Sequence, residues 1–189
     1  MVDCFDVLGL PRRASLTEDA LHLAYTSRSR ATHPDHGGTE EAAAQVNAAY
    51  ETLRTPERRL KHLLEIAGPE EARAWRTVPL DDGMMAVFGK LGKTMDDSHK
   101  FIERKAKAQT ALAKALLAGE EMNLREALEG IGFEIQDRRD ALERELPEID
   151  SALAGGEVDG WKRLAAIQAR LAYLGRWQSQ VRERLLALM

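Results

Sequence analysis

Apolar residues recur every three or four positions along almost the whole of this chain, and this spacing constrains its fold more than any other feature. A period of 3.6 residues collects such positions on one face of a helix. Alanine, leucine, glutamate and arginine, which are strong helix formers, dominate the composition, whereas the alternating β-branched and aromatic runs of a strand do not occur. The sequence therefore predicts an all-α protein.

Residues 17–54 are predicted to form two antiparallel helices joined by a short, exposed loop. Thr17 is a good N-cap for the first helix, and Thr39 opens the second. The first helix should stop at His33-Pro34, because the residue before a proline avoids the α region. A hairpin of this kind serves as plain scaffold unless its loop carries a function.

The rest of the chain is predicted to form a second, larger helical part. A short helix with three leucines on one face ends before Gly68-Pro69, and a polar linker follows at 69–79. Three long helices are then expected at about 80–118, 123–153 and 158–189, with Pro147 kinking or ending the second. Short connections between long helices favour an antiparallel three-helix bundle. The expected division is therefore 1–68, a linker at 69–79 and a bundle at 80–189.

The composition argues against several classes of protein, namely nucleic-acid binders, disulfide-bonded or thiolate-zinc proteins, and membrane-spanning proteins. The 189 residues carry 27 Lys and Arg against 31 Asp and Glu, a net charge of −4, so the basic excess of a nucleic-acid binder is missing. Cys4 is the only cysteine, which rules out an intrachain disulfide and a thiolate zinc site within the chain. Apolar runs fall far short of the ~20 residues that span a bilayer. We expect a cytoplasmic protein without a membrane or nucleic-acid partner.

The loop between the first two helices carries His33-Pro34-Asp35, and Arg28 and Arg30 lie near the end of the helix before it. In this respect the sequence resembles the J-domain family, as do Asp3–Leu10 near the N-terminus and Asn47–Leu53 in the second helix. The resemblance covers about residues 3–68. It implies that the tripeptide and the two arginines dock on a DnaK/HscA-type ATPase chaperone and favour its hydrolysing state, without catalytic chemistry or a cofactor on this chain.

The segment after the hairpin narrows the resemblance. Pro56, Arg59, Leu63, Leu64 and Gly68, together with the last helix from Tyr173 onward, are similar to co-chaperones of the HscB type. That resemblance implies a three-helix bundle that holds an iron–sulfur cluster scaffold protein (IscU-like) as its client. The residues at the client-binding positions are Met84, Met85, Phe88 and Tyr173. Where the family has glutamates after this patch, the chain has Gly89, Lys90, Gly92 and Lys93.

Other interpretations of the same residues stay open at this stage. The bundle of a J-domain protein can recruit an unrelated client, and the whole chain can be a non-catalytic helical adaptor. His33, Asp35 and His36 are residue types that ligate metals, which would suit a metal-dependent enzyme. Arg28 and Arg30 can be an ordinary solvated face. Met84 and Phe88 also fit the core stripe of their own helix.

Overall fold

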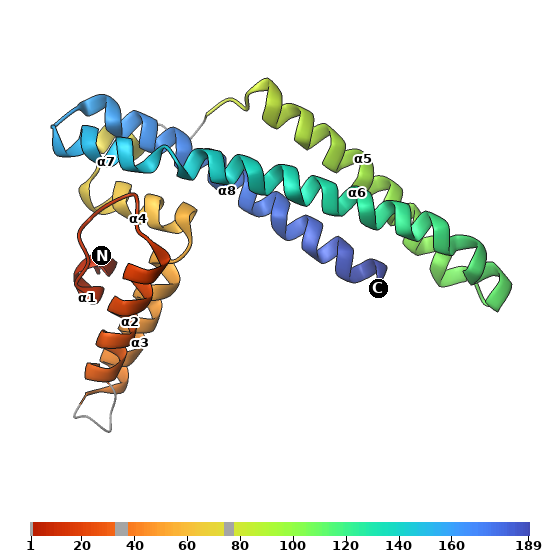
Figure 1. The fold of residues 1–189 in the computed structure, drawn as a ribbon, viewed down its shortest axis with the longest axis horizontal. Coiled ribbons are helices and arrows are strands. Elements are labelled where there is room, and N and C mark those ends of the chain that lie inside the picture. Colours follow the sequence, from red (N-terminus) through yellow and green to blue (C-terminus); the bar gives the residue numbers. More distant parts are fainter. Residues whose placement is uncertain (1, 33–37, 74–77) are drawn as a thin grey trace. The chain divides into compact units, whose positions relative to one another are not determined.

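The computed structural model describes residues 2–32, 38–73 and 78–189, and the regular structure within these ranges is helical throughout. The all-α prediction is confirmed. In chain order the elements are α1 (Cys4–Leu8), α2 (Glu18–Thr32), α3 (Glu40–Leu53), α4 (Pro56–Ala67), the 3-10 turn η2 (Glu70–Arg73), α5 (Asp82–Lys107), α6 (Ala111–Glu143), α7 (Leu146–Ala154) and α8 (Val158–Leu188) (Figure 1).

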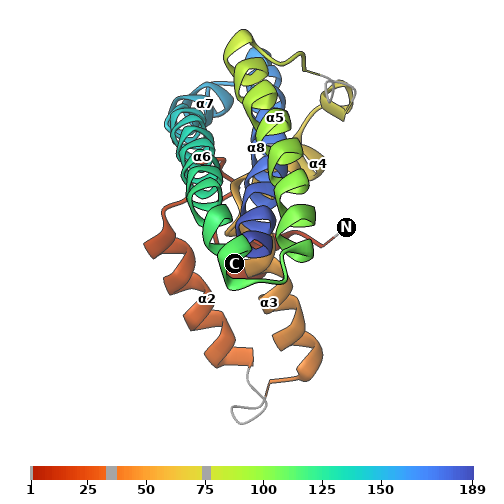
Figure 2. The ribbon, with the colours of Figure 1, turned by 90° about the vertical axis from the view of Figure 1, so that its right-hand side faces the viewer.

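The predicted hairpin is formed by α2 and α3, which lie side by side in both ribbon views (Figures 1 and 2). The side chains of Thr17 and Thr39 each accept a hydrogen bond from the amide three residues later, at 3.2 and 3.1 Å, so both predicted caps are present. Between the helices, the Tyr25 ring stacks on Tyr50 with centroids 4.2 Å apart, and its hydroxyl donates to Asn47 at 2.9 Å. These contacts hold the two helices in a fixed register.

A short helix that the sequence analysis did not predict, α1, begins the described fold. The carboxylate of Asp3 caps it by accepting the amide hydrogen of Phe5 at 2.8 Å. Gly9 ends it with φ of +69°, a left-handed conformation in which a side chain is strained. Phe5 is fully buried, so this single turn anchors the N-terminus in the core.

By packing, the chain divides into two compact units. The first consists of Met1–Val78 with Leu142–Leu171, and the second of Pro79–Ala141 with Ala172–Met189. The core of the first unit joins residues of α1 to α4 with residues of α7 and early α8; its fully buried members include Phe5, Leu53, Leu60, Leu146, Ile149, Leu164 and Leu171. The N-terminal helices thus share one core with residues far along the chain, and both α6 and α8 contribute to both units.

The second unit is built from α5, most of α6 and the end of α8, which run alongside one another (Figure 2). One prediction here was wrong, because α5 ends at Lys107 instead of near residue 118, and α6 begins at Ala111 instead of near 123. Thr110 provides the reason: its hydroxyl accepts the amide hydrogen of Ala113 at 3.1 Å and starts a new helix. Pro147 acts as expected, since α6 ends at Glu143 and the proline lies in the first turn of α7.

Candidate functional site

The tripeptide His33-Pro34-Asp35, like His36, lies outside the described residues. Its place in the chain is nevertheless defined at both ends, because α2 ends at Thr32 and α3 begins at Glu40 after its Thr39 cap. The tripeptide therefore belongs to the connection of the α2–α3 hairpin.

Arg28 and Arg30 are both exposed in the last turns of α2, as predicted, but they point in different directions. Residues that are two positions apart in an α-helix lie roughly 200° apart around its axis. Arg28 leans against the turn after α1, where a Cβ atom on Gly9 would come within 2.8 Å of its guanidinium. The two arginines therefore do not form one continuous cationic surface, and Arg30 is the one directed away from α1.

Two buried or half-buried charged residues, Asp150 and Arg59, hold the segment that leads into α2. The sequence analysis named Arg59 only for its family resemblance and did not identify Asp150. The carboxylate of Asp150, in α7, accepts the amide hydrogens of Ala14 at 2.6 Å and Ser15 at 2.9 Å, and the Ser15 hydroxyl at 2.5 Å. Arg59, only 5% exposed, donates to the carbonyl oxygens of Ala14 and Leu53, both at 2.8 Å. Burial lowers the pKa of Arg59, and nearby carboxylates, including Asp150, act in the opposite direction. Ala14 is thus held through both its N–H and its C=O.

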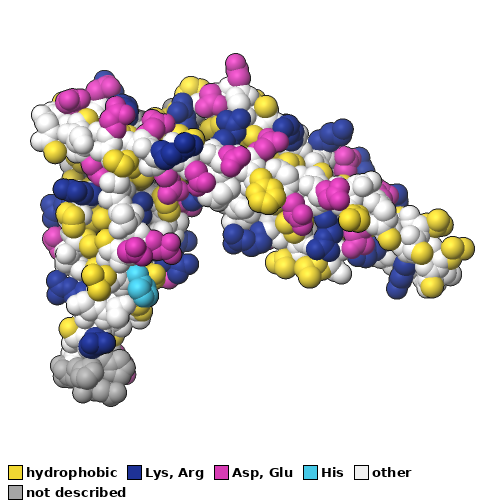
Figure 3. Space-filling view, viewed as in Figure 1, with side chains coloured by type: hydrophobic (Ala, Val, Ile, Leu, Met, Phe, Trp, Pro, Cys, Tyr) yellow, Lys and Arg dark blue, Asp and Glu magenta, His cyan; other side chains and the backbone are white. Residues whose placement is uncertain are grey.

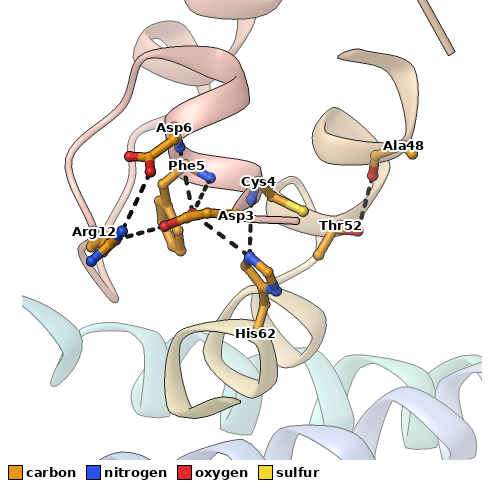
Figure 4. Close-up of polar contacts among 8 residues, drawn as sticks. All are labelled: Asp3, Cys4, Phe5, Asp6, Arg12, Ala48, Thr52 and His62. Atoms are coloured by element: carbon orange, nitrogen blue, oxygen red, sulfur yellow. Dashed lines mark hydrogen bonds and ion pairs between the residues drawn. The ribbon is translucent and has the colours of Figure 1, made fainter. Parts of the chain in front are cut away.

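A second polar network fixes the start of the chain (Figure 4). The guanidinium of Arg12 donates to the Asp3 carboxylate at 2.6 Å, and His62 accepts the amide hydrogen of Cys4 at 3.0 Å. Burial alone would raise the pKa of Asp3, but hydrogen bonds from the Phe5 amide, from Arg12 and from the Asp6 amide outweigh it and lower that pKa. The hairpin therefore stands on a base in which α1, α4 and the approach to α2 are tied together.

The four residues at the expected client-binding positions divide into two groups. Met84 is 2% exposed and belongs to the core of the second unit, whereas Met85 and Phe88 are each 51% exposed. Tyr173 is half-buried on α8. Met84 therefore supports the surface from below, and Met85, Phe88 and Tyr173 are accessible.

Trp177 brings the accessible aromatic residues together. Its ring centroid lies 5.7 Å from that of Phe88 on α5 and 6.3 Å from that of Tyr173 one turn earlier on α8. The guanidinium of Arg176 sits over the Tyr173 ring at 4.7 Å, a cation–π geometry. The i, i+4 spacing of Tyr173 and Trp177 is the sequence signal for this cluster.

Next to this cluster runs a groove between α5 and α8, which we call the α5–α8 groove. Phe88, Leu91 and Met95 line it from α5, and Glu183, Arg184 and Ala187 line it from α8. Its volume is about 530 Å³. An open, mainly apolar groove of this kind is a common place for another chain to bind.

Charge and metal chemistry point to no other site in the part of the chain that the structure describes. Lys and Arg side chains alternate with Asp and Glu on the face shown in Figure 3, without a broad patch of one sign. The described residues hold no cluster of His, Cys, Asp and Glu that would bind a metal ion. None of the helices described here is both long enough and apolar enough to cross a membrane.

Comparison with known proteins agrees with this geometry. The DnaJ domain family matches residues 3–62, the range of α1 to α4 up to His62. The co-chaperone protein HscB homolog of Aromatoleum aromaticum is 27% identical over 165 residues, covering 82% of this chain and 83% of that protein. The homolog of Bordetella avium is 26% identical over 194 residues, covering 90% and 95%. The solved structure of the chaperone HscB from Vibrio cholerae has the same fold, with a TM-score of 0.57 at 19% identity over the full length of both chains.

A helical hairpin carrying the DnaJ domain signature makes this chain a J-domain protein. Its relatives and its fold extend that kinship through the C-terminal part, and the chain belongs to the J-domain co-chaperones of the HscB type.

Proposed function

We propose that this co-chaperone stimulates the ATPase of a DnaK/HscA-type chaperone through His33, Pro34 and Asp35, and delivers to it an iron–sulfur cluster scaffold protein. The observation that carries the proposal is the extent of the sequence similarity. HscB homologues align with 82% and 90% of the chain, and therefore with both the N-terminal hairpin and the C-terminal helices. In this scheme residues 1–68 act as the J-domain, 69–79 as a linker and 80–189 as the client-binding bundle.

The α2–α3 hairpin supports the first half of the proposal. A loop that must bias another protein's conformation needs fixed ends, and the Tyr25–Tyr50 stack and the clamp on Ala14 supply rigidity at the hairpin and its base. Arg30, and Arg28 from the α1 side, would add charge-assisted contacts and speed the encounter. The chain needs no chemistry of its own for this role, and a cytoplasmic setting suits it.

The aromatic cluster supports the second half. Met85 and Phe88 expose apolar surface next to Tyr173 and Trp177, and exposed aromatic residues in a packed cluster are typical anchors of protein–protein interfaces. An unrelated client protein would bind to the same surface, so the surface by itself does not distinguish that alternative from an iron–sulfur scaffold protein. His33, Asp35 and His36 all lie outside the described residues, and a metal-dependent role for them is tested by metal analysis of the purified protein.

The first test is steady-state ATP hydrolysis by the DnaK-type chaperone of the same organism, with and without this protein. We expect stimulation by the native chain and none by His33→Gln. His36→Gln is the matched control, because it makes the same change three residues away and should stimulate as the native chain does. Equal stimulation by His33→Gln would show that the tripeptide is not the working element and would favour the adaptor.

The second test concerns the client. Pull-down with the iron–sulfur scaffold protein should succeed with the native chain and fail with Phe88→Ala. Phe133→Ala is the control, because Phe133 is also an exposed phenylalanine, 72% exposed, but lies in a different groove between α6 and α8. Loss of the scaffold in both variants, or in neither, would contradict the assignment of the site.

A further inference from the structure

The α5 side of the α5–α8 groove includes a position without a side chain, Gly92. A Cβ atom added to Gly89 or Gly92 would meet no other atom within 4 Å, so neither glycine is required by packing inside this chain. In the middle of a long helix each glycine costs roughly 1 kcal/mol relative to alanine. Gly92 lines the groove, so it leaves space beside Phe88 and Leu91 where the backbone of another chain can approach closely.

The other two departures from the family pattern, Lys90 and Lys93, are not among the residues that line this groove. Lys90 donates to Glu134 of α6 at 2.6 Å and is therefore directed to the far side of α5. Asp96, which follows the groove residue Met95, is ion-paired with Lys100 at 2.6 Å. The α5 wall consequently offers a partner apolar surface and little free negative charge.

The α8 wall carries the unpaired charge. Within the described residues Arg184 makes no ion pair or hydrogen bond, and Arg176 contacts only the ring of Tyr173. Among the described residues that line the groove, Glu183 is the only acidic one. Two guanidinium groups against one carboxylate leave this wall cationic, and their eight-residue separation corresponds to roughly 12 Å along the helix.

We propose that the α5–α8 groove binds an acidic amphipathic helix, which lays its apolar face on Phe88, Leu91 and Met95 and places carboxylates against Arg176 and Arg184. A helix lying in an apolar groove is an established mode of recognition, and guanidinium groups pair well with carboxylates in a partly desolvated rim. The inference rests on the proposed client-binding role of the bundle and adds to it the charge of the client segment, which must be negative.

The test uses two labelled peptides about five helical turns long. Both carry the same leucine and phenylalanine face, and one has glutamates and the other lysines at the flanking positions. Fluorescence anisotropy with the full-length protein should show saturable binding of the acidic peptide only, weakening as salt is added. Phe88→Ala and the double change of Arg176→Glu with Arg184→Glu should each raise the Kd about tenfold or more.

Two further variants separate the groove from nonspecific attraction. Gly92→Leu should weaken binding by filling the space beside Phe88 and Leu91, while its better helix propensity preserves the fold. Arg182→Glu is the matched control, because Arg182 lines the groove between α6 and α8 and its reversal should leave the Kd unchanged.

Three results would overturn the proposal. They are equal or tighter binding of the basic peptide, an effect of Arg182→Glu as large as that of the double change of Arg176→Glu with Arg184→Glu, and failure of both peptides to bind. Loss of self-association in Phe88→Ala, measured by sedimentation, would likewise overturn it by assigning the groove to a second copy of the chain. No chaperone is present in this experiment, so its outcome is independent of the ATPase test of the proposed function.

Discussion

Removing the carboxylate of Asp150 should destabilise the first unit, because this carboxylate binds the segment at Ala14 and Ser15, 135 positions earlier in the chain than Asp150 in the case of Ser15. In Asp150→Ala three donors lose their acceptor, namely the Ala14 amide, the Ser15 amide and the Ser15 hydroxyl. Their fates differ. Ser15 borders an open cleft of about 580 Å³, so water can replace the carboxylate there. Ala14 is fully buried, and its amide would stay unpaired.

The expected magnitude follows from these environments. An unsatisfied buried amide costs about 1–3 kcal/mol, and a charge-assisted hydrogen bond contributes about 1.5–3 kcal/mol. Because solvent compensates Ser15, the loss in free energy of unfolding should be about 3 kcal/mol instead of the full sum over three bonds. Asp150→Asn keeps one carbonyl acceptor and should lose roughly half as much.

Urea unfolding followed by circular dichroism measures this difference. Glu148→Ala on the same helix is the control, since Glu148 reaches only an exposed ion pair with Arg163, and it should unfold at the same urea concentration as the native protein. An unchanged midpoint for Asp150→Ala would refute the reasoning, because it would mean that the clamp on Ala14 contributes nothing to folding.

Three further predictions concern separate parts of the molecule. The lowered pKa of Asp3 means that its contribution to stability is present above its ordinary value of 3.8 and is lost as the pH falls through the lower folded value. Asp3→Asn should therefore flatten the fall in urea midpoint below about pH 4, and an equally steep fall would argue against this role. Thr39→Ala should cost about 1 kcal/mol through loss of the α3 cap, seen as a lower unfolding midpoint. Met84→Ala should lower the free energy of unfolding by about 2–5 kcal/mol because the side chain is buried, whereas Met85→Ala next to it should unfold as the native protein does. Equal losses in the two variants would contradict the assignment of Met84 to the buried face of α5 and of Met85 to the exposed face.

Local signals in the sequence predicted most of the helices. Thr17 and Thr39, each before an apolar periodic run, predict two helix starts that the structure confirms. The break at residues 108–110 was missed because alanine-rich helix formers continue on both sides of it, and propensity alone cannot separate one long helix from two. Thr110 was the available signal, and its side chain does cap the second of the two helices.

Long-range polar contacts left no comparable signal. Asp150 and Ala14 lie 136 positions apart, and Arg59 and Ala14 lie 45 apart, so neither pair follows from a local pattern. Periodicity also placed Met84 and Phe88 on the same stripe, although Met84 is buried and Phe88 half exposed. An apolar stripe about 100° wide or more defines one side of the helix. Which residues at the edge of the stripe stay exposed to solvent depends on how the neighbouring helices pack.

The shared core of the first unit has a consequence for synthesis on the ribosome. Residues of α1 to α4 bury side chains against Leu146, Ile149, Leu164 and Leu171, so that core cannot close until residue 171 has emerged. At about 5–20 residues per second the N-terminal helices wait several seconds with apolar surface uncovered. The N-terminal helices are thus synthesised first, but the core that they share is among the last parts of the fold to be completed.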